Sequence, residues 1–308
     1  MNILGRRYFF FILSLLIIIP GLLLAVFEGL NLSVDFTGGT LLEFQFESGN
    51  TPLPADIITI YNEFNIDDVQ VTTTGENTIV ARSSFIDDET RAAIVQEIGD
   101  TFEEQVTVLR FDSVGPTIGR EVAIRAAIAV SIAAVIVVVY ITYAFRGIPH
   151  AFRYGICAII AMIHDVAIVI SLAAIGGILW GWQVNALFLT ALLTVIGFSV
   201  QDKIVVFDRV RENTNIYRRL PFETLVNHSI VQTLQRSINT QLMTVEFMLL
   251  ALALFGGITL QEFSVILLVG LLSGTYSSIF IAAPVLVVWE KREWRTWFGR
   301  GKQSEAAA

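Results

Sequence analysis

The sequence offers little material for a disulfide bond or a metal site. It contains one cysteine, Cys157, and three histidines in 308 residues. A single cysteine excludes an intrachain disulfide and does not indicate a redox compartment. The chain has no cysteine pair, no His-Glu-x-x-His and no second histidine within helical reach of His164. We therefore expect neither a metal nor a cofactor.

Charged residues are scarce. They make up 16% of the chain, against 54% hydrophobic residues, whereas soluble domains average about 25% charged residues. This balance predicts an α-helical polytopic membrane protein. Six stretches reach the ~20 residues that a transmembrane helix needs, and they are 8–26, 122–145, 154–178, 186–207, 239–255 and 263–289.

The first hydrophobic stretch could be a cleaved signal peptide or a retained helix. Residues 8–26 are too long for the apolar core of a signal peptide, and no Ala-x-Ala-like cleavage site follows them. We expect a retained transmembrane helix.

Basic residues flank the predicted helices unequally. The loops at 179–185 and 256–262 contain no Lys or Arg, whereas the N-terminus, the loops at 146–153 and 208–238, and the C-terminal tail contain many. Since Lys and Arg accumulate on the cytoplasmic side, both termini are expected in the cytoplasm of a bacterial-type cytoplasmic (inner) membrane.

The chain between the first two predicted helices is strongly acidic. Residues 28–119 hold 17 acidic and 3 basic residues, a net charge of −14, so the rest carries +6 of the total of −8. Nucleic-acid binding would require a basic surface, so we expect no nucleic-acid partner. The predicted organisation is a first transmembrane helix at 1–27, an extracytoplasmic domain at 28–119, helices two to six at 120–290 with a cytoplasmic segment at 208–238, and a cytoplasmic tail at 291–308.

Residue patterns in the acidic domain predict its fold. Apolar alternation indicates strands at 42–46, 68–72, 77–82 and 105–110, and helix signals occur at 54–64 and 87–98. The order βαββαβ is that of a small α+β ferredoxin-like domain.

Asp202 lies inside the fourth predicted helix. An ionisable group in the hydrocarbon layer costs about 2.5–3.5 kcal/mol on insertion scales, so it usually serves a function. Low dielectric favours a neutral carboxyl group and a nearby guanidinium favours the carboxylate, so such a group can load and release a proton. Ser199 and Arg209 share a helix face with Asp202, and this polar stripe could lead water inward. The alternative is a buried ion pair that only orients the helices.

Two further polar residues lie near the middle of the third predicted helix. Asp165 could take part in a proton relay or form a helix-packing hydrogen bond, and His164 could be a relay or a satisfied interior histidine. Six helices with one external domain also match half of a twelve-helix transporter built from two repeats. A second half on another chain is therefore expected.

Several segments resemble the SecD/SecF family of protein-export membrane proteins, on its SecF side, within the resistance-nodulation-division superfamily. They are Val34-Asp-Phe-Thr-Gly-Gly-Thr40, Val114-Gly-Pro-Thr-Ile-Gly119, His164-Asp165, Ile204 to Asn213 and Gly274 to Ala282. The resemblance implies a non-enzymatic subunit that pairs with SecD and uses the proton-motive force to assist SecYEG in moving preproteins across the lipid bilayer.

The resemblance also implies site residues. The proton-carrying acid of the family falls on Asp202, and the basic residue before the fifth helix falls on Arg236. The family usually has Asn-Asp followed by Thr or Ser, where this chain has Gln201-Asp202-Lys203. The acid is kept while its neighbours differ, so its proton affinity is expected to differ as well. Asp165, His164 and Ser199 are candidates for a secondary relay.

The sequence leaves three alternative functions. Ser199 and His164 superficially resemble an intramembrane serine protease, which would need a Ser–His hydrogen bond and oxyanion donors. A small-molecule or lipid exporter half of the same superfamily, and an assembly factor without proton coupling, are further alternatives.

Two more expectations concern unusual segments. Lys203 and Glu246 are predicted to form an ion pair between the fourth and fifth helices, since neither charge is stable alone in hydrocarbon. Residues 221–241 carry apolar residues at helical spacing and could form an amphipathic helix on the membrane surface.

Overall fold

The computed structural model describes residues 2–47, 51–74, 77–144, 146, 151–241, 247–255 and 258–293. The chain divides into two compact units. One consists of Met1–Asn31 with Val130–Ala308, and the other is Leu32–Ala129.

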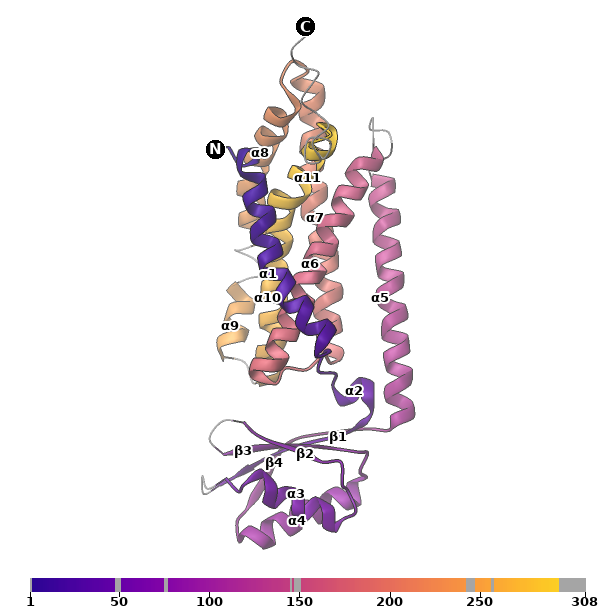
Figure 1. Ribbon diagram of the computed structural model, residues 1–308, viewed down its shortest axis with the longest axis vertical. Coiled ribbons are helices and arrows are strands. Elements are labelled where there is room, and N and C mark those ends of the chain that lie inside the picture. Colours follow the sequence, from indigo (N-terminus) through magenta and orange to yellow (C-terminus); the bar gives the residue numbers. More distant parts are fainter. Residues whose placement is uncertain are drawn as a thin grey trace. The chain divides into compact units, whose positions relative to one another are not determined.

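The smaller unit contains a four-stranded antiparallel sheet. Its elements are β1 (Gly39–Phe46), α3 (Pro54–Glu63), β2 (Gln70–Thr74), β3 (Thr78–Ser83), α4 (Asp88–Phe102) and β4 (Val106–Val114). The strand order is β2-β3-β1-β4, and α3 and α4 cover one face of the sheet (Figure 1). This confirms the predicted ferredoxin-like domain. The tip of the predicted β2–β3 hairpin, residues 75–76, lies outside the described residues.

The core of this domain follows from strand alternation. Leu42, Phe44 and Phe46 are two residues apart on β1, so their side chains point to the same face of the sheet. There they pack with Ile57 of α3 and Ile94 of α4 in one buried cluster. A half-buried antiparallel sheet with helices on one face accounts for the alternation in the sequence.

The two ends of the domain meet at three glycines. Gly38 follows the short helix α2 (Val34–Thr37) with a φ of 73°, and Gly39 also has a positive φ. A Cβ on Gly38 would lie 2.6 Å from the Cα of Pro116, and one on Gly119 would lie 2.5 Å from the Gly38 nitrogen. Gly38, Gly39 and Gly119 are thus required by backbone conformation or close approach.

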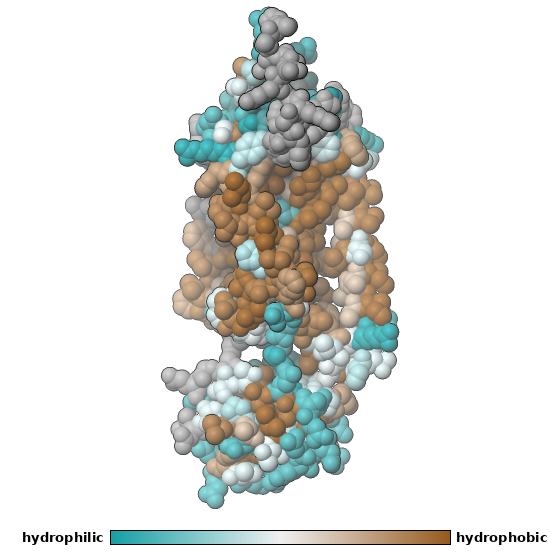
Figure 2. Space-filling view, in the orientation of Figure 1, coloured by the Kyte–Doolittle hydropathy of each residue, from teal (hydrophilic) through white to brown (hydrophobic). Residues whose placement is uncertain are grey.

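The larger unit is a bundle of helices. Its elements are η1 (Leu4–Arg6), α1 (Arg7–Phe27), α6 (Ala151–Trp180), α7 (Ala186–Ile216), α8 (Phe222–Gln241), α9 (Phe247–Phe255), α10 (Ile258–Ser277), the π-helix η3 (Ser278–Ala282) and α11 (Ala283–Glu290). The helix α5 (Pro116–Ala144) begins in the smaller unit and ends in this one. Figure 2 shows that the helical unit is apolar along most of its surface and hydrophilic at the end that holds the N-terminus and α8.

Five helical segments of the described residues are long and apolar enough to cross a membrane: Leu4–Phe27, Pro116–Ala144, Phe152–Trp180, Ala186–Ile216 and Leu260–Glu290. They confirm a multi-pass helical membrane protein. The other predicted span, 239–255, is described only as the end of α8 and as α9, because residues 242–246 lie outside the described part of the chain.

Small residues let the bundle helices approach closely. A Cβ on Gly21 of α1 would lie 2.3 Å from the Ser171 side chain of α6, and one on Gly270 of α10 would lie 2.3 Å from Val195 of α7. Ser171 also donates a hydrogen bond of 3.0 Å to the Ile18 carbonyl. This is the usual packing device of membrane helices.

Most of the segment at 208–238 is helical. The helix α7 continues beyond Phe207 to Ile216, and α8 begins six residues later. Leu225, Val226 and Ile230 of α8 are buried, and Asn213 of α7 donates hydrogen bonds to Ser229 and Gln232 of α8. The apolar face of this amphipathic helix therefore packs on protein, and the surface-lying arrangement is wrong.

Candidate functional site

Asp165 is the centre of a buried polar cluster between α6, α7 and α10. Its Oδ2 accepts hydrogen bonds from Ser199 (2.6 Å), Lys203 (2.7 Å) and Ser277 (2.7 Å). Its Oδ1 accepts one from Ser273 (2.7 Å) and lies 3.1 Å from the Nδ1 of His164. With five partners, the carboxylate is fully occupied as an acceptor.

Helical spacing explains how the cluster forms. Ser199 and Lys203 are four residues apart on α7, and Ser273 and Ser277 are four residues apart on α10. Residues at this spacing share a helix face. Each helix thus presents two donors to the one acid of α6. A π-helix begins directly after Ser277, a helix irregularity that often occurs at functional sites.

Lys203 is completely buried and has all its donors satisfied. Its Nζ contacts Asp165 Oδ2, the Ser199 carbonyl at 3.1 Å and the Ser199 hydroxyl. An ammonium group has three donors, and these three contacts use all of them. The Glu246 that the sequence predicted as its partner lies outside the described residues, so that pair stays a prediction.

Asp202 has a different environment from Asp165. Its side chain is buried, with 9% of the residue exposed, and among the described residues its Oδ2 has no hydrogen-bond partner. Asp202 forms a side-chain hydrogen bond with Thr275, and the positive charges of Lys203 and Arg236 attract its carboxylate. Two acids on adjacent helices thus differ sharply, because Asp165 is saturated with donors and Asp202 is not.

Arg236 lies on the exposed side of α8. Within the described part of the chain, no hydrogen bond or ion pair joins it to Asp202, although its charge interacts with that acid. Arg236 lines a cavity of about 320 Å³ with Asp208, Arg209, Glu212 and Gln232. Val205, three residues from Asp202 along α7, also lines this cavity.

His164 and Ser199 take defined places beside Asp165. The His164 ring is stacked on Tyr276, with 6.0 Å between centroids, and its Nε2 has no partner among the described residues. The predicted polar stripe on α7 is split, because Ser199 faces Asp165 whereas Arg209 donates to Gln232 at 2.7 Å.

The structure therefore brings together Asp165, His164 and Ser199, with Asp202 one residue from Lys203. Ser273 and Ser277 were not identified as site residues from the sequence, although their spacing of four in a hydrophobic helix could have indicated them. No hydrogen bond between Ser199 and His164 is present in the described cluster, since Ser199 donates to Asp165. A Ser–His dyad for proteolysis is not formed. Within the described ranges, no three His, Cys, Asp or Glu side chains converge as a metal site.

Family models match most of the chain. The model "Protein export membrane protein SecD/SecF, C-terminal" matches residues 94–292, and the model "SecD/SecF GG Motif" matches residues 23–49. The second match contains Gly38 and Gly39, whose backbone conformation is described above.

Two relatives are similar to this chain over nearly their whole length, and a solved structure is similar to it as well. The chain is 69% identical over 307 residues to the protein translocase subunit SecF of Anaerolinea thermophila, with 100% of both chains covered. It is 44% identical to that of Thermobaculum terrenum, covering 100% of this chain and 99% of the relative. A crystal structure of SecDF from Thermus thermophilus, a translocon-associated membrane protein, matches with a TM-score of 0.81 and 32% identity over 95% of this chain. This chain spans only 39% of that SecDF chain.

Proposed function

Because the chain belongs to the SecD/SecF family of protein-export membrane proteins, we propose that it is the SecF subunit of a SecD–SecF complex that assists SecYEG in translocating preproteins. SecF relatives match it from end to end, whereas it spans 39% of a SecDF chain. A separate SecD chain would supply the remaining part. The complex lies in the cytoplasmic membrane with both termini of this chain in the cytoplasm, and the subunit has no enzymatic activity of its own.

Protons are the coupling ion in this proposal, and Asp202 carries them. The observation that supports this role is that the Oδ2 of Asp202 is buried and has no hydrogen-bond partner among the residues that the structure describes. A carboxylate oxygen without a donor can accept a proton without first breaking a hydrogen bond.

Asp165 acts as a fixed anion beside the proton carrier. Its five partners include the Lys203 ammonium, and protonation of Asp165 would disrupt this ion pair and leave a buried positive charge without compensation. The roles of His164, Ser199 and Asp165 in a proton relay stay predictions. The simpler assignment is that these groups hold α6, α7 and α10 around Asp202.

The available energy is sufficient for a conformational step. One proton that crosses a potential of 100 mV releases about 2.3 kcal/mol. A change of this size shifts a two-state equilibrium by roughly 50-fold. Neutralising Asp202 would remove its attraction to Lys203 and Arg236, both of which act on it, and would thereby favour a different packing of α7 against its neighbours.

The test is the substitution Asp202→Asn, compared with the matched control Asp208→Asn six residues along α7. Asp208 is largely exposed, whereas Asp202 is buried. In membrane vesicles that contain SecD and SecYEG, Asp202→Asn should abolish the stimulation of export by the proton-motive force and Asp208→Asn should preserve it. Full stimulation with Asp202→Asn, in protein that still co-purifies with SecD, would refute the proton-carrying role.

The exporter and protease alternatives have less support. The relatives are named as translocase subunits, and Ser199 donates its hydroxyl hydrogen to Asp165. The same vesicle assay distinguishes coupling from a purely structural role, because a structural subunit would tolerate Asp202→Asn.

A further inference from the structure

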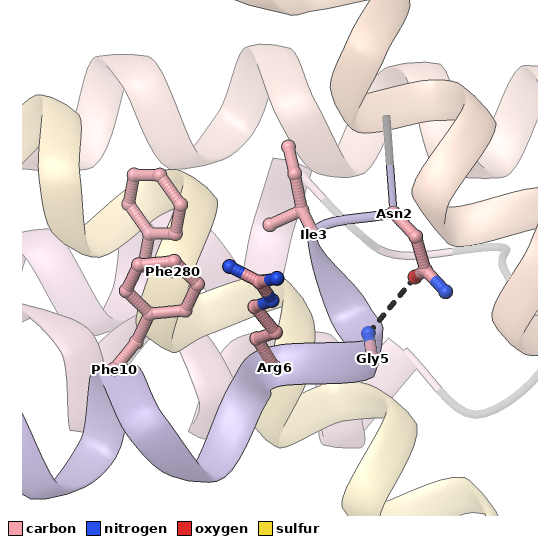
Figure 3. A pocket seen from close by; sticks show the side chains of 6 residues that line it. All are labelled: Asn2, Ile3, Gly5, Arg6, Phe10 and Phe280. Carbon is pink, nitrogen blue, oxygen red and sulfur yellow. Dashed lines mark hydrogen bonds between the residues drawn. The ribbon is translucent and has the colours of Figure 1, made fainter.

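An open cavity at one end of the helical bundle combines a basic side chain with an aromatic surface. It has a volume of about 590 Å³ and is lined by Asn2, Ile3, Gly5, Arg6, Phe10 and Phe280. Figure 3 shows Arg6 between the rings of Phe10 and Phe280 on one side and Asn2 and Gly5 on the other. The two rings are packed together, with 4.2 Å between centroids.

Arg7 has acidic partners, whereas its neighbour Arg6 has none among the described residues. The Arg7 guanidinium is paired with Glu223 at 2.8 Å and with Glu293 at 2.6 Å. Arg6 is exposed, and none of the described residues forms a hydrogen bond or ion pair with its side chain. The cavity lining contains no acidic residue. The cavity therefore holds a positive charge that the described part of the chain does not compensate.

A second cavity lies further along α1, between this helix, α6 and α10. It has a volume of about 250 Å³, and its apolar lining includes Leu13 and Ile17 of α1, Ile168 of α6, and Val269, Leu272 and Tyr276 of α10. Leu13, Ile17 and Leu272 are each exposed by 39–51%. In a membrane-spanning helix, such exposed apolar side chains contact lipid or another protein.

One helix face links the two cavities. Phe10, Leu13 and Ile17 follow one another at spacings of three and four, which places them on one side of α1, and Arg6 directly precedes this helix. On the opposite wall, Tyr276 packs against Phe280 with 5.0 Å between centroids, and its hydroxyl donates to the Phe10 carbonyl at 3.0 Å. The aromatic row thus continues from the basic end toward the apolar cavity.

The length of this surface matches one leaflet of a bilayer. Eleven residues separate Arg6 from Ile17, which corresponds to about 16 Å along a helix. Half of a ~30 Å hydrocarbon core is about 15 Å. A phosphate at Arg6 would therefore place an acyl chain along Phe10 and Leu13 as far as Ile17.

We propose that the groove between α1 and α10–η3 binds an anionic phospholipid, with its phosphate at Arg6 and an acyl chain over Phe10, Phe280 and the apolar cavity at Leu13 and Ile17. Charge complementarity favours this occupant over an apolar helix of a partner chain, because a helix would leave Arg6 uncompensated. Guanidinium groups bind phosphate through parallel hydrogen bonds.

The test measures lipid binding to the delipidated full-length protein by native mass spectrometry. Phosphatidylglycerol and phosphatidylcholine with identical acyl chains are compared, and one basic contact near the membrane surface should give a roughly fivefold preference for the anionic lipid. Arg6→Gln should remove this preference. Arg219→Gln is the matched control, because Arg219 is also exposed at a helix connection but lies outside the groove, and it should leave the preference unchanged.

A third variant examines the apolar part of the site. Leu13→Trp fills the deeper cavity and should weaken binding of both lipids while the preference for the anionic one persists. Equal binding of the two lipids to the unaltered protein, or an unchanged preference in Arg6→Gln, would overturn the proposal. So would displacement of phosphatidylglycerol by millimolar inorganic phosphate, which would indicate a phosphate site without a role for the acyl chain.

A separate experiment tests whether a protein, and not a lipid, occupies the groove. In native membranes, a photoreactive amino acid in place of Ile17 crosslinks to whatever molecule occupies the groove. The proposal predicts a crosslink to phospholipid. Efficient crosslinking to another polypeptide would show that a partner helix covers the groove and would overturn the lipid assignment.

Discussion

Lys203 and Asp165 form an ion pair with 2.7 Å between Nζ and Oδ2, and their side chains are only 0% and 1% exposed. Removing one partner of such a pair leaves an uncompensated buried charge, at a cost of about 3–5 kcal/mol, whereas replacing both by apolar groups can be nearly neutral. The pair therefore makes α6 and α7 depend on each other.

A double-mutant cycle should reveal this dependence. Lys203→Met and Asp165→Leu should each lower the stability of the detergent-solubilised protein by about 3–5 kcal/mol, and the double variant should lose much less than the sum. Arg125→Gln is the control, because its partner Glu121 and Arg125 itself are more than half exposed, and it should cost at most about 1 kcal/mol. Strictly additive losses at Lys203 and Asp165 would contradict the pairing.

Arg236 should act on Asp202 through its charge, since no direct ion pair joins the two in the described structure. Arg236→Lys keeps the charge and should retain most of the export activity, whereas Arg236→Gln should reduce it and alter its pH dependence. Export by vesicles at several pH values is the measurement, with Arg219→Gln as a control for loss of a surface charge. Equal defects in the Lys and Gln variants would instead indicate a specific guanidinium contact.

Alanine substitutions at three glycines should distinguish the cost of backbone strain from the cost of steric overlap. Gly115→Ala should be neutral, because Gly115 has no positive φ and open space at its Cβ. Gly29→Ala, at a φ of 83° with nothing nearby, should cost about 1–2 kcal/mol. Gly38→Ala combines a positive φ with overlap on Pro116 and should cost more than Gly29→Ala. Thermal unfolding of the three full-length variants gives the comparison, and equal stability of the Gly29 and Gly38 variants would exclude a contribution from overlap.

The acidic domain should fold when residues 32–119 are expressed alone, because its core is closed by its own strands and helices. Its one tyrosine, Tyr61, is buried, and burial raises the pKa of its hydroxyl. The unfolded chain would ionise near pH 10, so the stability of the fragment should be constant below that pH and fall above it. Alkaline absorbance titration and circular dichroism report both events. A random-coil spectrum at pH 7, or ionisation of Tyr61 near pH 10 in folded protein, would contradict this prediction; Phe44→Asp supplies an unfolded reference.

The fold was largely predictable because its periodic patterns arise from simple geometry. Alternation at Leu42, Phe44 and Phe46 identifies a half-buried strand regardless of what lies around it. The end of α7 was not predictable in the same way. Hydropathy changes at Asp208, where the predicted membrane segment ends, but the helix continues to Ile216 because α8 packs beside it.

The site was predictable only in part. A charge within a hydrophobic stretch identified Asp202 and Asp165, since this signal is local in sequence. The partner of Lys203 depends on how α6, α7 and α10 are rotated about their axes, which a single sequence does not encode in a readable pattern. The contacts of Lys203 with Asp165 and Ser199 were therefore not predicted. Ser273 and Ser277 were missed as well, because their contribution is visible only when the three helices are assembled.

The contact between Gly38 and Pro116 has a consequence for how such chains can change over evolutionary time. The first and last strands of the domain are paired, from Gly39 opposite Val114 onward, so the chain leaves the domain beside the point where it entered. A module with adjoining ends can be lengthened, exchanged or lost by recombination without stretching the chain on either side. Gly38, Gly39 and Gly119 preserve that adjacency. They would therefore restrict sequence changes at the junction while leaving the interior of the module free to diversify.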